Sequence, residues 1–116
     1  GERSQRIECR VGGADGNPYL VASAVLGAAL QGIEEHLEPT VAVTGNAYEI
    51  QDSLPADLQF APNLRMAAER LGNSTVAHEL FGIEFVDHFV TSRLWEAREY
   101  ERHVNSWQLE RYFEII

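Results

Sequence analysis

The chain has very little cysteine: Cys9 is the only one among 116 residues. A single cysteine excludes an internal disulfide, so we expect a reducing compartment, the cytoplasm. Long hydrophobic runs are also missing, because the longest apolar stretch, residues 18–30, is too short to span a bilayer. The sequence therefore predicts a cytoplasmic protein with no membrane partner.

Positive charge is scarce as well. The chain carries 9 Lys and Arg against 18 Asp and Glu, for a net charge of −9. A nucleic-acid backbone needs a basic surface, so we expect no nucleic-acid partner. Hydrophobic residues make up 45% of the chain, which favours a folded core over disorder. The length is that of one small domain.

Residues 5–11 predict a short β-strand whose side chains alternate between two faces. One face carries Arg6, Glu8 and Arg10. The other face carries Cys9 between two apolar residues, so we expect its thiol to be buried. A carboxylate between two guanidinium groups suits one metal ion and two anions side by side. The alternative is a surface strand whose charges face water.

A glycine-rich turn follows and leads into a long helix, predicted over residues 18–37. Asn17 is a good N-cap, and Pro18 suits the first helical position, where its missing N–H would be unpaired anyway. The first part of this helix is apolar on nearly every side, which indicates burial on several faces. A chain of this length has little material to cover it. We therefore expect exposed apolar surface and self-association of the isolated chain.

The remainder predicts a long loop and then more helices. The loop covers residues 38–60, and the helices cover residues 62–71, 74–81, 83–103 and 105–113. Asn105 and Gln108 form a plausible capping box for the last helix. One short strand followed by about five helices makes the predicted fold class α+β and mostly helical.

Two motifs taken together point to a known family. Arg6-Ile-Glu-Cys-Arg10 is followed by Asp15-Gly-Asn-Pro-Tyr19, and the pair closely resembles the glutamine synthetase family in the C-terminal part of its catalytic domain. Looser matches continue in a family-like order at residues 32–34, 45–49, 53–55, 82–86, 96–101 and 105–107. The resemblance implies that residues 1–116 are the C-terminal part of such a catalytic domain, an incomplete domain cut from a longer protein.

The resemblance also implies roles for the charged trio. Glu8 matches a ligand of a catalytic Mg²⁺ or Mn²⁺ ion, and Arg6 matches a residue that binds nucleotide phosphates. Arg10 matches a residue that binds the carboxylate of the substrate glutamate and acts in catalysis near the transferring phosphate. The family's ATP-dependent ligases join the glutamate side-chain carboxylate to ammonia or an amine through an acyl phosphate. The other metal ligands lie upstream in the family, so we expect the chain alone to be inactive.

Family members form rings with active sites between subunits, so the resemblance implies a homo-oligomeric parent enzyme. The alternative is a non-catalytic helical module for interaction or oligomerisation, derived from the same family.

Two further features carry weaker hypotheses. Tyr48 lies where some bacterial glutamine synthetases are reversibly adenylylated, but the residues after it depart from that group, so we expect Tyr48 to pack in or beside its loop. Glu84, Asp87 and His88 have a spacing that fits a metal, yet such groups are common on exposed helices, which is the interpretation we prefer.

Overall fold

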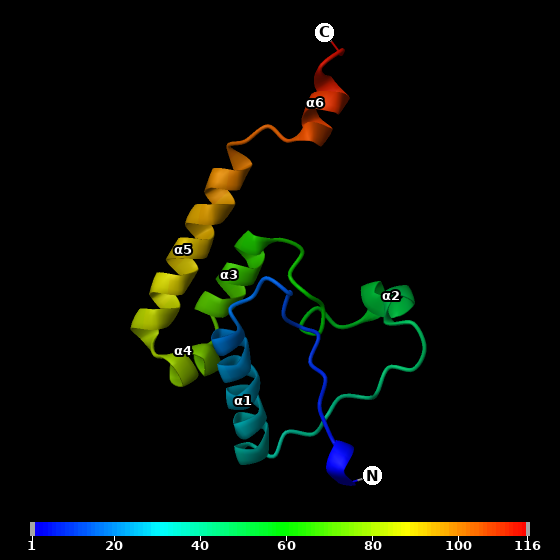
Figure 1. Cartoon of the computed structure of the whole chain (residues 1–116), viewed down its shortest axis with the longest axis vertical. Helices are drawn as coiled ribbons and strands as arrows, with labels where there is room; N and C mark the ends of the chain where they lie inside the picture. The colour runs from blue at the N-terminus through cyan, green and yellow to red at the C-terminus, as the bar shows by residue number, and fades with distance from the viewer. Residues whose placement is uncertain (1, 116) are drawn as a thin grey trace. The chain divides into compact units, whose positions relative to one another are not determined.

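The computed structural model describes residues 2–115 and divides the chain into two compact units, Gly1–Gly45 and Asn46–Ile116 (Figure 1). The first unit contains the 3₁₀ helix η1 (Glu2–Ser4) and the helix α1 (Pro18–Glu34). The second unit contains α2 (Ala47–Ile50), η2 (Gln51–Ser53), α3 (Leu64–Gly72), α4 (Thr75–Phe81), α5 (Ile83–Glu101) and α6 (Ser106–Tyr112).

The predicted strand over residues 5–11 is wrong, and with it the α+β class: residues 2–115 form helices, turns and loops with no strand. A strand is held by a ladder of hydrogen bonds to a neighbouring strand. No backbone hydrogen bond joins residues 5–11 to another described segment. Ile7 is 92% exposed, so no packing supports the segment either. The chain is therefore all-helical within the part that the structure describes.

Helix α1 begins as predicted. The side chain of Asn17 accepts hydrogen bonds from the backbone N–H groups of Tyr19 and Leu20, and Pro18 stands at the first helical position. No side chain of α1 is buried. The predicted exposed apolar surface is therefore confirmed along this helix.

The end of α1 comes earlier than predicted, at Glu34. The N–H of His36 donates to the carbonyl of Ile33 (3.3 Å), and the N–H of Leu37 donates to that of Gly32 (2.9 Å). These two bonds form a Schellman motif, which requires a left-handed residue. His36 occupies that position with φ +52°, and this conformation ends the helix before Leu37.

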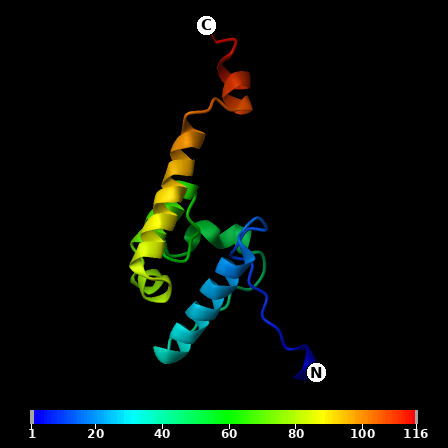
Figure 2. The same ribbon diagram turned by 60° about the vertical axis from the view of Figure 1, so that its left-hand side comes forward.

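The core lies where α3 and α4 pack against α5, as both ribbon views show (Figures 1 and 2). The buried hydrophobic residues of the described chain are Ala68, Ala77, Val86 and Ala97. Three of them are alanines, which let helices approach closely. These helices match the predicted ranges 62–71, 74–81 and 83–103 with shifted ends.

Gly82 makes the junction between α4 and α5. Its φ of +83° lies in a region that L side chains avoid, and its N–H donates to the carbonyl of His78 (2.9 Å). The ring of Phe81 on one side of the junction lies 5.5 Å from that of Phe85 on the other. The turn therefore sets α4 against the start of α5.

An ion pair links the far end of α5 to the start of α3. Arg65 donates through Nη2 and Nε to the two carboxylate oxygens of Glu101, at 2.7 and 3.3 Å. Hydrogen bonding to Glu101, and then its charge, raise the pKa of the Arg65 guanidinium above its ordinary value. A base whose pKa is raised by folding stabilises the folded state at every pH below the pKa that it has in the unfolded chain. That stabilisation is lost only as the pH rises above this pKa. The pair therefore introduces no pH dependence through Arg65 near neutrality.

The predicted loop over residues 38–60 contains two short helices, α2 and η2, that local pattern did not reveal. Its end is anchored to α3. Arg70 donates to the carbonyl oxygens of Gln59 (2.6 Å) and Ala56 (3.3 Å), while the side chain of Gln59 donates to the carbonyl of Leu54 (2.7 Å). The capping box of Asn105 and Gln108 at the start of α6 is confirmed.

Val86 is fully buried, with 0% of its surface exposed. We expect Val86→Ala to lower the free energy of unfolding by about 2 kcal/mol, because it removes buried methyl groups and leaves a cavity. Urea unfolding followed by circular dichroism measures the change. The matched control is Val104→Ala, whose side chain is 65% exposed and whose effect should stay within about 0.5 kcal/mol. Equal effects of the two substitutions would contradict this core.

Candidate functional site

The charged trio lies in the first unit, in the segment between η1 and α1, and all three side chains are exposed. Nε of Arg10 donates to Oε1 of Glu8, in an ion pair whose side chains are 84% and 64% exposed respectively. Arg6 has no hydrogen-bond or ion-pair partner among the described residues. Glu8 and Arg10 therefore contact each other, whereas no hydrogen bond or ion pair joins Arg6 to either of them in the described segment.

A metal site needs more than this segment offers. Glu8 supplies a hard carboxylate oxygen of the kind that Mg²⁺ prefers, but that carboxylate is paired with Arg10. Within residues 2–115 no group of three or more His, Cys, Asp and Glu side chains is placed to hold a metal ion. The set that includes Glu84 and His88 on α5 is thus not such a group. The described residues alone do not fit a metal centre.

Two predictions of burial are wrong. The thiol of Cys9 is exposed, as are Ile7 and Val11 on the same predicted face, so no described element packs over that face. Tyr48 lies in α2 and not in a loop, and it is 82% exposed, so little of its side chain packs against neighbouring residues. Both predictions assumed a covering surface that the described chain does not supply.

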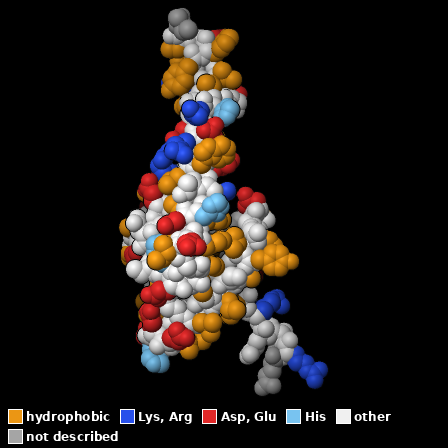
Figure 3. Space-filling view, turned by 90° about the vertical axis from the view of Figure 1, so that its left-hand side faces the viewer, with side chains coloured by type: hydrophobic (Ala, Val, Ile, Leu, Met, Phe, Trp, Pro, Cys, Tyr) orange, Lys and Arg blue, Asp and Glu red, His pale blue; other side chains and the backbone are white. Residues whose placement is uncertain are grey.

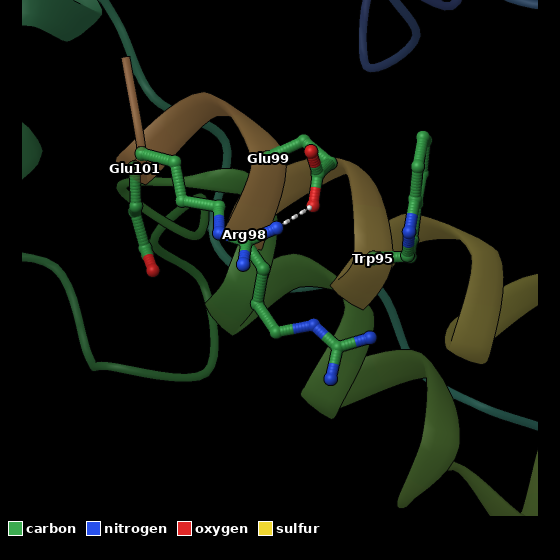
Figure 4. Close-up of a pocket in the computed structure, with 5 residues that line it drawn as sticks. Trp95, Arg98, Glu99 and Glu101 are labelled. Atoms are coloured by element: carbon green, nitrogen blue, oxygen red, sulfur yellow. Dashed lines mark hydrogen bonds and ion pairs between the residues drawn. The ribbon is translucent and has the colours of Figure 1, made fainter. Parts of the chain in front are cut away.

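Sequence reasoning missed a polar hollow on α5 of about 490 Å³. It is lined by Trp95, Arg98, Glu99, Glu101 and Arg102. In Figure 4 the carboxylate of Glu99 meets the guanidinium of Arg102, whereas the side chain of Arg98 extends away from Glu99. The signal for this hollow was the helical i, i+3, i+4, i+7 spacing of Trp95, Arg98, Glu99 and Arg102, which places them on one face.

Comparison with known proteins identifies the family. The family model described as "Glutamine synthetase, catalytic domain" matches residues 1–112. The chain is 41% identical to a glutamate–isopropylamine ligase of a Pseudomonas species over 96% of this chain and 24% of that protein. It is 41% identical to a gamma-glutamylethanolamide synthetase of Streptomyces coelicolor, over 97% and 23% respectively. It is 39% identical to a type-1 glutamine synthetase of Dictyostelium discoideum, over 100% and 22%.

These matches cover the trio and nearly everything after it, and they are matches to carbon–nitrogen ligases. The chain belongs to the glutamine synthetase family. It spans about a quarter of the length of the curated relatives it matches. No solved structure matches it significantly. No described helix combines the length and apolar character that a bilayer span requires.

The exposure of Cys9 can be tested directly. We expect the thiol of the folded chain to react with Ellman's reagent within about tenfold of the rate in urea, since an exposed thiol needs no unfolding to react. The release of thionitrobenzoate measures it, and Cys9→Ser provides the blank. A thiol that reacts only after unfolding would contradict the exposed position of Cys9.

Proposed function

We propose that residues 1–116 form part of the catalytic domain of an ATP-dependent ligase that joins the side-chain carboxylate of glutamate to ammonia or an amine. The observation that carries the proposal is the family match over residues 1–112, which includes the Arg6-to-Arg10 motif. The names of the relatives support it, since two are ligases or synthetases that act with an amine and one is a glutamine synthetase. They favour the reaction class and leave ammonia and amines as alternatives.

The proposed reaction has two balanced steps. The glutamate carboxylate oxygen attacks the γ-phosphorus of ATP, the bond to ADP breaks, and an acyl phosphate forms. The nitrogen of ammonia or the amine then attacks the acyl carbon, the C–O bond to phosphate breaks, and nitrogen loses a proton as the amide forms. Such phosphoryl transfer depends mainly on positioning and charge neutralisation.

The trio suits that demand. Glu8 would provide one oxygen ligand to a Mg²⁺ or Mn²⁺ ion, which when bound neutralises phosphate charge. Arg6 would bind the ATP phosphates, and Arg10 the carboxylate of glutamate and the transferring phosphate, since a planar guanidinium grips either with two hydrogen bonds. For these roles the Glu8–Arg10 ion pair must break. Because the pair is exposed to water, breaking it costs little free energy.

The rest of the parent protein must complete both site and fold. The remaining metal ligands would come from outside this chain, which supplies no such group within the described residues. The apolar surface of α1 would be covered there. We expect a cytoplasmic homo-oligomer, in which the domain of residues 1–116 is incomplete and inactive by itself.

In the full-length parent we expect Glu8→Gln to reduce kcat/KM for amide formation at least about a hundredfold and to raise the Mg²⁺ concentration required, because one anionic metal ligand is lost. A coupled assay for ADP release, with glutamate and a panel of ammonia and small amines, measures both. The matched control is Glu79→Gln on the exposed surface of α4, which should leave turnover unchanged. Full activity and metal dependence in Glu8→Gln would reject the ligand assignment. A parent that turns over no substrate in the panel would favour the non-catalytic module.

The cover proposed for α1 has its own test. Leu26 and Leu30 are 63% and 52% exposed on this helix. We expect Leu26→Glu to reduce self-association of the isolated chain in light scattering, because it breaks an exposed apolar surface, and to impair folding of the parent, where the same surface would be buried. If Leu26→Glu changes neither the self-association of the isolated chain nor the stability of the parent, the proposed burial of this surface is contradicted.

A further inference from the structure

The last two turns of α5 carry a polar face with an unusual composition. Trp95, Arg98, Glu99 and Arg102 follow one another at the i, i+3, i+4, i+7 spacing of a single helix face. At 3.6 residues per turn this face points away from Ala97, which is buried against the rest of the second unit. Figure 3 shows Arg side chains next to hydrophobic ones near the C-terminal end of α5. The face is thus outward and open to a partner.

Its groups are only partly satisfied within the chain. Nη1 of Arg102 donates to Oε1 of Glu99 at 2.9 Å. Arg98 has no hydrogen-bond or ion-pair partner among the described residues. Trp95 is 53% exposed although an indole is a large apolar group. An exposed indole beside an unpaired guanidinium is the composition that is enriched at binding surfaces.

The order of these residues is self-complementary. If a second α5 lies antiparallel to the first, with a two-fold axis midway between Arg98 and Glu99, each residue faces a defined partner. Arg98 then faces Glu99 of the second copy, and Trp95 faces Arg102 of the second copy. Each contact occurs twice, as a two-fold interface requires. The parallel arrangement would instead place Arg98 against Arg98.

We propose that this face of α5 binds a second copy of the same chain through an antiparallel, two-fold contact. The pairing gives Arg98 the carboxylate it lacks and places the Arg102 guanidinium over the Trp95 indole, an attractive cation–π geometry. The same four residues, together with Glu101, line the hollow of about 490 Å³ on this face. The inference goes beyond the ligase chemistry and does not depend on it. It assigns one surface to the proposed homo-oligomer.

Charge reversal at the axis tests the pairing in the full chain by sedimentation velocity. Arg98→Glu places carboxylate against carboxylate twice, and Glu99→Arg places guanidinium against guanidinium twice. We expect each to raise the dissociation constant of the dimer at least about tenfold. The double variant Arg98→Glu with Glu99→Arg should recover the dimer, and so should an equimolar mixture of the two single variants. The dimer should also weaken as salt is raised.

The mixture is the decisive sample, because only a contact between residues 98 and 99 of different copies predicts rescue between two defective chains. Association through the apolar surface of α1 would be the same in every sample. Arg3→Glu makes an equal change of charge outside α5 and is expected to leave the dissociation constant unchanged, while circular dichroism checks that helix content is retained. Single reversals without effect, or a mixture that stays as weak as its components, would overturn the proposal.

Discussion

The packing of α3 and α4 against α5 is the constraint on which the described structure depends. Val86 is the one large side chain fully removed from water among residues 2–115, and the three alanines around the same helices allow the close approach that buries it. Beyond this cluster, the Arg65–Glu101 ion pair ties the other end of α5 to α3. In the first unit, no side chain is buried among residues 3–45. The chain therefore carries one small core and a large amount of apolar surface that this core does not use.

That imbalance explains which features could be predicted from sequence. The cap at Asn17 and Pro18, the capping box of Asn105 and Gln108 and the end of α4 at Phe81 each depend on a few neighbouring residues. Such signals act locally, and they were predicted correctly. The strand over residues 5–11 depends on a second strand from elsewhere in a chain, and the burial of Cys9 depends on a layer packed over the face of the resulting sheet. Alternation of side chains predicts which residues would share a face of a strand. It does not provide the second strand whose hydrogen bonds are needed for a strand to form.

The same distinction between local features and features that depend on distant segments applies to the candidate site. Glu8 and Arg10 form an ion pair although the segment that carries them is not a strand. Their chemical roles came from the ordered motifs of the family and not from geometry, because a metal centre takes ligands from segments far apart in sequence. Arg6 illustrates the limit: its identity is evident from the motif, but no ion pair or hydrogen bond joins it to the other two in the described segment. The residue types of the site could be predicted from the sequence, but their assembly into one site could not.

The chain's two open surfaces differ in a way that bears on what covers each. The surface of α1 is apolar, with exposed Leu26, Leu30 and Ile33, which is the composition of a surface kept permanently inside one fold. The outer face of α5 is charged, and its one large apolar group, Trp95, precedes the two arginines along the helix. Such a face tolerates water when alone and gains specificity when paired, which suits a contact between separately folded copies. The same contrast explains why the α5 face escaped sequence reasoning: Glu99 and Arg102 are typical of a solvated helix, and their self-complementary order has meaning only once α5 is known to turn that face outward.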